Sequence, residues 1–231
     1  MGRRSVVSFV STQDELRPMS KTQIRSYQTK DVVRFRKTAE EFGGLSNMAP
    51  GFPVVLLGYQ IRTSEALYQT CRFPHMPDVQ QMILNERSPM TAKMRSKPYR
   101  EVSRPDWDDV RVKVMKWCLR VKLIYNWRKF SELLLSTGDR PIVEDSRKDS
   151  YWGAMPQDDD TLNGQNVLGR LLMDLRKKLV DEPETLRICR PLQIPNFCLL
   201  GEPIPTVMSH WQHEVDLVRS DDDGPAQSAF L

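Results

Sequence analysis

The chain has 231 residues, with 34 Lys and Arg against 30 Asp and Glu, so its formal net charge is +4. Its length predicts one domain with additional terminal segments, and its composition of 39% hydrophobic and 28% charged residues excludes a mostly disordered, collagen-like or coiled-coil chain. No apolar stretch approaches the ~18 residues of a membrane span, and the polar N-terminus lacks the apolar segment of a secretion signal.

The first part of the chain predicts a loose arm followed by short strands. Residues 1–30 are rich in Ser, Thr, Gln and Arg and show little hydrophobic periodicity, which is typical of a flexible basic arm. Residues 31–36 alternate enough to form a first strand. The apolar run 54–57 ends at a glycine, and residues 59–62 predict a further short strand after that turn.

Helical patterns then dominate the chain. Thr63 or Ser64 can cap a first helix that carries Glu65 in its first turn, where a carboxylate complements the helix dipole. Pro77 and Pro89 stand at the first position of the next two helices, where proline is favoured.

The longest predicted helix covers residues 107–127, with Asp106 as its N-cap and apolar residues at helical spacing. Residues 130–135 form a further apolar stretch that stops at a glycine. The last clear helix covers residues 166–179, whose leucines form one buried stripe. These patterns predict a mainly helical α+β fold.

The pattern changes after Asp181, where repeated prolines prevent another long helix. We expect the segment 190–205 to run extended over the surface of the domain. The predicted organisation is a flexible basic arm at 1–30, a catalytic-type domain at 31–181, and a Pro-rich, extended acidic tail at 182–231.

Charge is distributed unevenly along the sequence. Residues 1–37 carry a net charge of +6, residues 87–128 carry +8, and residues 181–231 carry −6. Basic surfaces attract phosphates, so nucleic acid or a nucleotide is a natural partner. Solvated helix faces with ion pairs explain the same charges, and charge alone favours that simpler interpretation.

The metal-binding and redox signals are weak. The four cysteines form no C-x-x-C pair and predict reduced thiols in a cytosolic protein. His210 and His213 can share a helical face, but no further ligand lies close in sequence, so we expect no metal and no cofactor. Phosphate-binding glycine loops, a hydrolase nucleophile elbow and kinase motifs are absent from the sequence.

Several polar residues lie in apolar, turn-rich stretches. Each has a simple structural explanation as a cap or turn residue, but together they outline a pocket with carboxylates for acid–base work, tryptophans, and glycines where a ligand approaches the backbone. These residues are Gly43, Gly44, Asn47, Glu65, Trp107, Asp149, Trp152, Gly153 and Asn166.

Six ordered segments carry a resemblance to a known family. They are 42–50 (FGGLSNMAP), 63–69 (TSEALYQ), 88–93 (SPMTAK), 104–108 (RPDWD), 149–153 (DSYWG) and 166–173 (NVLGRLLM). Together they resemble the NADAR superfamily, and the resemblance covers residues 32–179. It implies a single NADAR/YbiA-like domain and chemistry on N-glycosidic bonds of ADP-ribose-like or ribose-phosphate compounds.

Two branches of the family suggest different substrates. The sequence resembles most the branch that accompanies DarT-type toxins, which implies removal of ADP-ribose from guanine bases of DNA, or of RNA, with an ADP-ribosyltransferase toxin as functional partner. The YbiA-like branch implies instead an N-glycosidase acting on ribosylamino pyrimidine intermediates of the riboflavin pathway. A non-catalytic module that binds ADP-ribose or NAD, and a plain nucleic-acid-binding protein, remain open alternatives.

The resemblance also suggests roles for the site residues. Glu65 is expected to be the main acid–base or charge-stabilising carboxylate, acting mostly ionised, and Asp149 to bind ribose hydroxyls or assist it. Lys37 is expected either to bind phosphate or to attack an opened ribose as an amine; an exposed strand-end lysine is the equal alternative.

The remaining candidates are expected to bind the ligand. Trp152 would stack on a base or pack on the ribose, and Asn47 and Asn166 would hold hydroxyl or phosphate groups. Arg104 and the basic segment 87–128 would hold a nucleic-acid backbone. No metal is required by this scheme.

Overall fold

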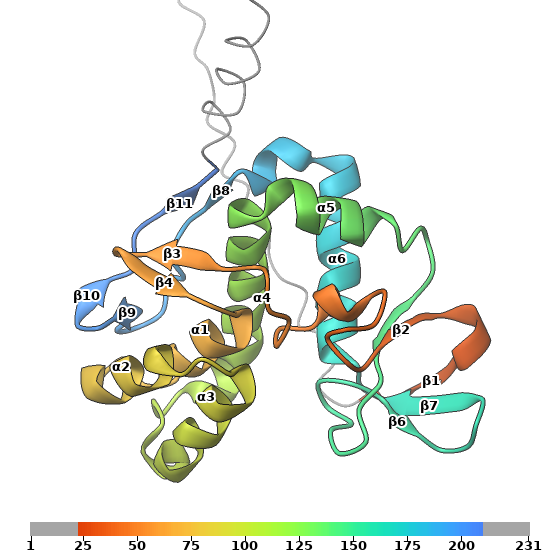
Figure 1. The fold of residues 1–231 in the computed structure, drawn as a ribbon, viewed down its shortest axis with the longest axis horizontal. Helices are drawn as coiled ribbons and strands as arrows, with labels where there is room; N and C mark the ends of the chain where they lie inside the picture. Colours follow the sequence, from red (N-terminus) through yellow and green to blue (C-terminus); the bar gives the residue numbers. More distant parts are fainter. Residues whose placement is uncertain (1–22, 210–231) are drawn as a thin grey trace, which may run out of the picture.

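A computed structural model describes residues 23–209 of the chain (Figure 1). In this part of the chain six α-helices surround one core, and α4 runs through its middle. The helices are α1 (Ser64–Thr70), α2 (Pro77–Asn85), α3 (Pro89–Ser96), α4 (Trp107–Tyr125), α5 (Trp127–Leu135) and α6 (Val167–Asp181). The same range contains four short 3-10 helices: η1 (Thr29–Asp31), η2 (Gly43–Leu45), η3 (Lys97–Val102) and η4 (Pro183–Leu186).

The strands are short and form several small sheets. β2 (Val33–Phe35) pairs in parallel with β5 (Ile142–Glu144), and β3 (Val54–Leu56) forms a hairpin with β4 (Tyr59–Ile61). An antiparallel sheet has the order β1 (Arg25–Gln28), β7 (Thr161–Gly164), β6 (Met155–Pro156). The mainly helical α+β prediction is therefore confirmed, but β5, β6 and β7 were not foreseen.

The central helix ends slightly earlier than its pattern predicts. At Asn126 the backbone leaves the helical conformation, with φ −128° and ψ 43°. The Asn126 side chain donates to the carbonyls of Lys122 and Pro53, both at 3.0 Å, and so closes the end of α4. The chain turns here into α5, so α4 ends two residues before the predicted end at 127, and the predicted apolar stretch 130–135 lies within α5.

The predicted helix cap at Thr63 forms, a further cap forms at Ser88, and the predicted cap at Asp106 does not form. The Thr63 hydroxyl accepts the backbone N–H of Ala66 at 3.2 Å, and Ser88 caps α3 through Thr91. Asp106 stands at the start of α4, but its carboxylate makes no capping bond and binds Arg104. A guanidinium two residues away is the stronger partner because it is charged and binds both carboxylate oxygens.

The described end of the predicted arm belongs to the fold. β1 pairs with β7 over four residues, from Arg25 opposite Gly164 to Gln28 opposite Thr161. The Tyr27 side chain is buried in a second, small hydrophobic cluster. The arm prediction is therefore wrong for residues 25–28, because backbone pairing overrides a polar composition; residues 1–22 of the predicted arm lie outside the described part of the chain.

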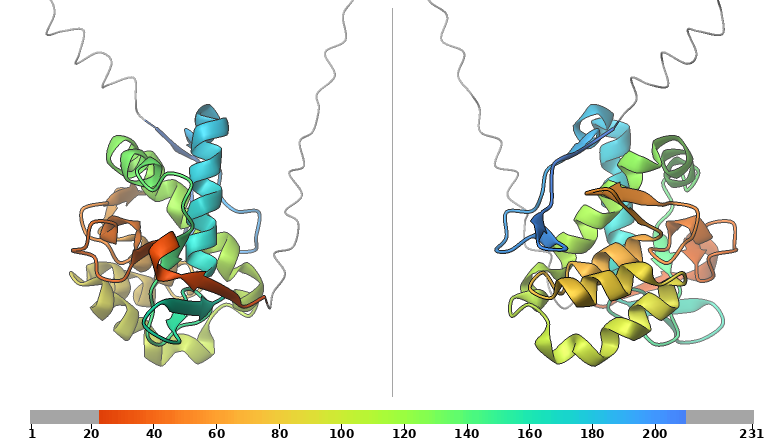
Figure 2. Two further views of the ribbon diagram at one scale, coloured as in Figure 1. Left: turned by 90° about the vertical axis from the view of Figure 1, so that its right-hand side faces the viewer. Right: turned by 60° about the vertical axis from the view of Figure 1, so that its left-hand side comes forward.

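The segment after α6 is also more than a surface tail. Residues 183–208, which we call the C-terminal strap, contain η4 and the pairs β8 (Ile188–Cys189) with β11 (Val207–Met208) and β9 (Cys198–Leu199) with β10 (Glu202–Pro203). Figure 2 shows the strap along the outer side of α4. Its apolar side chains join the main core: Leu186, Cys189, Phe197, Leu199, Ile204 and Val207.

Side chains of the helices hold this strap in place. Gln80, which is fully buried, donates to the carbonyls of Thr70 and Cys198 and accepts the N–H of Leu200. Trp117 donates through its indole N–H to the carbonyl of Arg190 at 3.1 Å. The folded unit thus extends past the predicted boundary at 181; residues 210–231 lie outside the described range. No helix within residues 23–209 is long and apolar enough to cross a membrane.

Candidate active site

Glu65 lies at the centre of a buried polar network. It is the second residue of α1 and only 4% exposed. The cap at Thr63 fixes the start of the helix, and the Glu65 backbone N–H donates to the carbonyl of Asn47 at 2.9 Å. The loop after η2 and the first turn of α1 are therefore joined at this carboxylate.

Two neutral amides hold the Glu65 carboxylate. Asn47 Nδ2 donates to Oε2 at 3.1 Å, and Gln69 Nε2 donates to Oε1 at 2.9 Å. Ser96 in turn donates to Gln69 Oε1 at 3.0 Å, which orients that amide. No cation neutralises Glu65 through these bonds, so its charge stays available to a developing positive charge.

Asn47 also offers an unused acceptor. Its Oδ1 is buried and has no hydrogen-bond partner among the described residues. A buried polar atom without a partner costs free energy, and a hydroxyl of a bound ligand would satisfy it. The ligand-binding role of Asn47 stays a prediction, and Oδ1 is the atom that would accept a hydrogen bond from the ligand.

Glu144 is a second carboxyl of the site, and the sequence analysis missed it. It is the last residue of β5 and half-buried. Burial, followed by the nearby charges of Asp149 and Glu65, raises the pKa of Glu144 to about 7, while Lys93 opposes this rise. A carboxyl that is partly protonated at neutral pH can act as a general acid. The apolar pair Ile142-Val143 directly before it was the available signal, but three residues are too few to reveal a strand.

Asn166 positions this second carboxyl instead of facing a ligand. Its side chain is fully buried, accepts the backbone N–H of Glu144 at 3.1 Å and donates to the carbonyl of Ile142 at 2.8 Å. The backbone of Asn166 has φ 49°, in the left-handed region that asparagine tolerates. Because both amide atoms are engaged, the expectation that Asn166 binds the substrate is not supported.

Asp149 closes the turn that carries Trp152. Its Oδ1 accepts the backbone N–H groups of Tyr151 at 3.0 Å and Trp152 at 2.9 Å. The half-buried Trp152 ring packs edge-on against Tyr68 and Tyr151, with centroids 5.7 and 5.3 Å away. Asp149 therefore closes a turn and also places a charge near Glu144. Trp152 stays a candidate for contact with a base or ribose.

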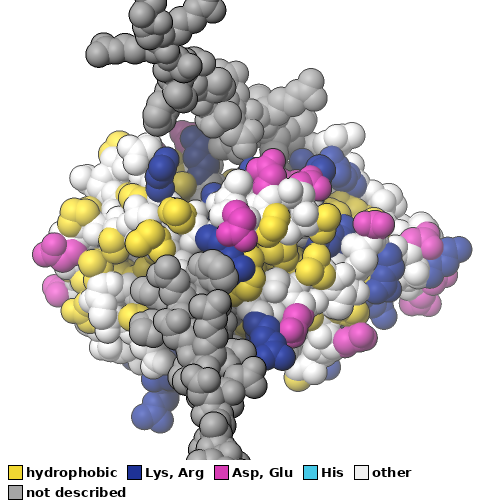
Figure 3. All heavy atoms as spheres, turned by 90° about the horizontal axis from the view of Figure 1, so that it is seen from above, with side chains coloured by type: hydrophobic (Ala, Val, Ile, Leu, Met, Phe, Trp, Pro, Cys, Tyr) yellow, Lys and Arg dark blue, Asp and Glu magenta, His cyan; other side chains and the backbone are white. Residues whose placement is uncertain are grey.

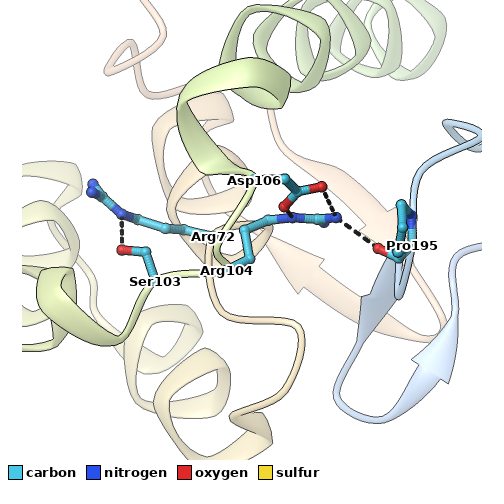
Figure 4. A network of polar contacts seen from close by, with 5 residues as sticks. All are labelled: Arg72, Ser103, Arg104, Asp106 and Pro195. Atoms are coloured by element: carbon cyan, nitrogen blue, oxygen red, sulfur yellow. Dashed lines mark hydrogen bonds and ion pairs between the residues drawn. The ribbon is translucent and has the colours of Figure 1, made fainter.

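Trp107 and Arg104 make structural contacts. Trp107 is only 6% exposed, and its ring contacts the Tyr68 ring and the Arg72 guanidinium. Arg104 is 4% exposed, binds Asp106 and donates to the carbonyl of Pro195 in the strap at 2.7 Å (Figure 4). The Trp107 ring is occupied by these contacts, whereas Nη1 of Arg104 is buried and has no hydrogen-bond partner among the described residues, so a ligand-binding role of Arg104 stays a prediction.

The motif glycines are required by the protein's own backbone. A Cβ at Gly43 would lie 2.4 Å from the carbonyl oxygen of Lys37, and one at Gly153 would lie 2.4 Å from that of Glu144. Real Cβ atoms do not approach backbone so closely, whereas the neighbour of a Cβ at Gly44 would be a side-chain atom, Cδ2 of Leu133 at 2.6 Å. The glycines therefore allow chain segments to meet around the site, and no ligand approach is needed to explain them.

The candidate Lys37 is exposed, whereas Lys122, for which no role was predicted, is buried. Lys37 is exposed, and its backbone N–H donates to Glu40; its proposed chemistry stays a prediction. Lys122, in the basic segment, is 1% exposed and donates to the carbonyls of Gly44 at 2.5 Å and Ser46 at 3.1 Å. Burial, with a smaller effect of Lys129, lowers the pKa of Lys122 to about 7.

The segment 87–128 does not form one basic face. Arg104 and Lys122 are buried, and Arg120 donates to strap carbonyls of Thr185 and Ile188. The face of the molecule seen from above in Figure 3, away from α3, likewise shows Lys and Arg side chains interspersed with acidic and hydrophobic ones. The sequence sum of +8 therefore overstates the basic surface of this segment.

Part of this charge does gather in an open hollow beside Asp149, which we call the basic hollow. Its volume is about 440 Å³. It is lined by Met90, Lys93, Met94, Lys97, Arg100, Ser146, Lys148 and Asp149. Within residues 23–209, no group of three or more His, Cys, Asp or Glu is arranged to hold a metal ion.

The family model of the NADAR domain matches residues 34–180. The chain belongs to the NADAR family. N-glycosidase YbiA of Escherichia coli (strain K12) is 32% identical over 169 residues, which cover 71% of this chain and 99% of YbiA. The NMR structure of E. coli YbiA aligns with a TM-score of 0.57 at 31% identity, covering 67% of this chain and 88% of that one.

Two longer proteins are also similar to this NADAR chain. Riboflavin biosynthesis protein VVA0006 of Vibrio vulnificus is 33% identical over 156 residues, covering 68% of this chain and 41% of that protein. Riboflavin biosynthesis protein PYRR, chloroplastic, of Zea mays is 31% identical over 176 residues, covering 71% and 27% respectively. The NADAR chain thus spans less than half of each of these two relatives.

Proposed function

We propose that this NADAR protein is an N-glycosidase that hydrolyses the bond between a base nitrogen and C1′ of a ribose. The observation that carries the proposal is the pair of carboxyls in different environments. Glu65 is held by two amides, and Glu144 has a pKa raised to about 7. Two carboxyls in such different surroundings can divide the work of glycoside hydrolysis: one acts as the acid, and the other stabilises the developing positive charge.

In the proposed reaction, the C1′–N bond breaks as the Glu144 carboxyl gives its proton to the leaving base. Positive charge develops at C1′ and the ring oxygen, and the Glu65 carboxylate stabilises it. The oxygen of a water molecule bonds to C1′ and its proton passes to a carboxylate of the site. The products are the protonated base nitrogen and a ribose with a free 1′-hydroxyl.

For the substrate, we propose ADP-ribose linked to guanine in nucleic acid, released as free ADP-ribose. The resemblance to the toxin-associated branch supports it, and so does the open basic hollow beside Asp149, which leaves room for a base still attached to a strand. In this setting a DarT-type ADP-ribosyltransferase would be the functional partner. A phosphorylated ribosylamino pyrimidine is the second candidate, favoured by the names of the relatives.

The test is turnover of both substrates by the purified protein. We expect free ADP-ribose from guanine-ADP-ribosylated single-stranded DNA, and a loss of at least about 100-fold in kcat for Glu65→Gln. Release of base from the pyrimidine substrate alone would replace the nucleic-acid substrate with the second candidate. If the protein turns over neither substrate but ADP-ribose raises its unfolding temperature, it is a binding module, and the N-glycosidase proposal is overturned.

A further inference from the structure

The basic hollow carries more positive charge than the reaction at C1′ requires. Lys93, Lys97 and Arg100 line it from α3 and η3, and Lys148 lines it from the opposite loop. Asp149 is the single acidic residue of the lining. Four cations facing one carboxylate make a site for an anion with several negative charges.

These cations are not used inside the fold. The side chains of Lys93, Lys97, Arg100 and Lys148 form no ion pair with another residue in the range 23–209. Arg100 instead lies near another cation, since its charge contributes to lowering the pKa of Arg72. Like charges kept together without partners cost stability, which a bound polyanion would relieve.

Three of the cations form a row. Lys93, Lys97 and Arg100 are four and three residues apart on consecutive turns, so they follow one side of the α3–η3 segment. The row leads away from the carboxyl pair, because Lys93 is the member whose charge acts on Glu144. A row of cations fits successive phosphates of a strand better than one compact phosphate group.

Exposed apolar side chains complete the surface. Met90 and Met94 also line the hollow, and they are 57% and 56% exposed. Such adaptable apolar side chains next to cations give unstacked bases a contact surface without selecting a sequence. The hollow therefore combines phosphate-binding and base-contacting groups.

We propose that the basic hollow binds the phosphate backbone of a single nucleic-acid strand beside the base that is cleaved. This inference rests on the proposed function and adds where the strand that carries the modified guanine is held. Lys97 and Arg100 bind phosphates outside the reacting nucleotide, and Met90 and Met94 contact a neighbouring base. The diphosphate of ADP-ribose is the competing occupant.

The experiment measures binding of an unmodified, fluorescent single-stranded oligonucleotide at several salt concentrations. Three phosphate contacts predict a slope of log K against log salt of about −2 for the wild type. The double variant Lys97→Gln/Arg100→Gln should bind about tenfold more weakly, with a slope near −0.7. The matched control Lys113→Gln/Arg128→Gln removes two exposed cations that do not line the hollow and should bind like wild type.

The outcomes separate this inference from the proposed function. Unmodified DNA needs no hydrolysis, so Glu65→Gln should bind it like wild type, and binding without turnover would refute the reaction but not the strand site. Equal slopes for wild type and the Lys97/Arg100 variant would overturn the strand site. Complete displacement of the oligonucleotide by ADP-ribose would also overturn it and assign the hollow to the diphosphate.

Discussion

The side-chain oxygen of Asn166 accepts the backbone N–H of Glu144 at 3.1 Å, so the residue directly before α6 fixes the residue that ends β5. The other half of the same amide donates to Ile142, two residues earlier on that strand. This pair of bonds sets the backbone of Glu144 beside the charges of Asp149 and Glu65. The arrangement makes Asn166 a positioning residue for the proposed general acid.

Removing the Asn166 amide should release Glu144. Asn166→Gly tolerates the left-handed backbone but leaves a buried N–H and a carbonyl unpaired, so we expect a loss of about 2–4 kcal/mol in stability. The pKa of Glu144 should fall toward its ordinary value, moving the alkaline limb of the kcat–pH profile to lower pH. Chemical denaturation and a pH–rate profile measure both effects; an unmoved limb would contradict the positioning role.

Glu144→Gln should remove the proposed acid while keeping a similar shape. We expect kcat to fall by about 10²–10⁴-fold, the usual contribution of a general acid. Wild-type activity should decline as pH rises through about 7, because Glu144 then loses its proton, and this decline should be absent in the variant. Initial rates between pH 5 and pH 9 test it.

The same carboxyl should make stability depend on pH. The folded-state pKa of Glu144 is about 7 and its ordinary value is 4.5, so the native state binds the proton more tightly than the unfolded state. Its favourable contribution is complete below pH 4.5 and is lost as pH rises through 7. The stability of Glu144→Gln relative to wild type should therefore rise across this window, as measured by urea unfolding at pH 4, 5.5 and 8.

Lys122 should give a pH dependence of the opposite sign. Its pKa is lowered from 10.5 to about 7, so between these values the unfolded state binds the additional proton and wild-type stability rises with pH. Lys122→Met should flatten that rise, while the unpaired carbonyls of Gly44 and Ser46 cost about 1–3 kcal/mol each. Lys129→Gln is the control. Identical pH dependence of Lys122→Met and wild type between pH 6.5 and 9.5 would refute the lowered pKa.

The strap should depend on one buried side chain. Gln80→Ala removes three hydrogen bonds that join Thr70, Cys198 and Leu200, and we expect a stability loss of about 2–4 kcal/mol. Thermal unfolding measures it. Gln81→Ala, on the exposed side of the same helix, should change stability by less than about 0.5 kcal/mol. Equal effects of the two variants would show that the strap is not held by Gln80.

The sequence predicted best where a local pattern and a cap agree. The start of α1 at Thr63, the proline starts of α2 and α3, and the leucine stripe of α6 were all read correctly, since each depends on residues within one or two turns. The position of Glu65 in the first turn of α1 also follows from local residues. The resemblance named the family correctly because its motifs lie in these same segments.

The site was predicted less well because identical side chains serve different purposes in different surroundings. Trp107 and Asn166 have the residue types that bind ligands, but contacts with Tyr68 and with β5 occupy them. Arg104 uses two of its three guanidinium nitrogens to bind Asp106 and the strap. Glu144 carried only the weak signal of the two apolar residues before it, since its raised pKa depends on burial and on charges from distant positions in the chain. Short strands such as β5 have too few residues for a period to be seen.

The amino-acid sequence by itself determined the helices, the NADAR motifs and the carboxylate at Glu65, because these depend on local spacing. Tertiary structure alone decided which polar groups are free to act. Burial sets the pKa of Glu144 and of Lys122, and long-range pairing turns residues 25–28 and 183–208 into parts of the fold. Electrostatics and burial are properties of the assembled chain, so no local pattern contains them.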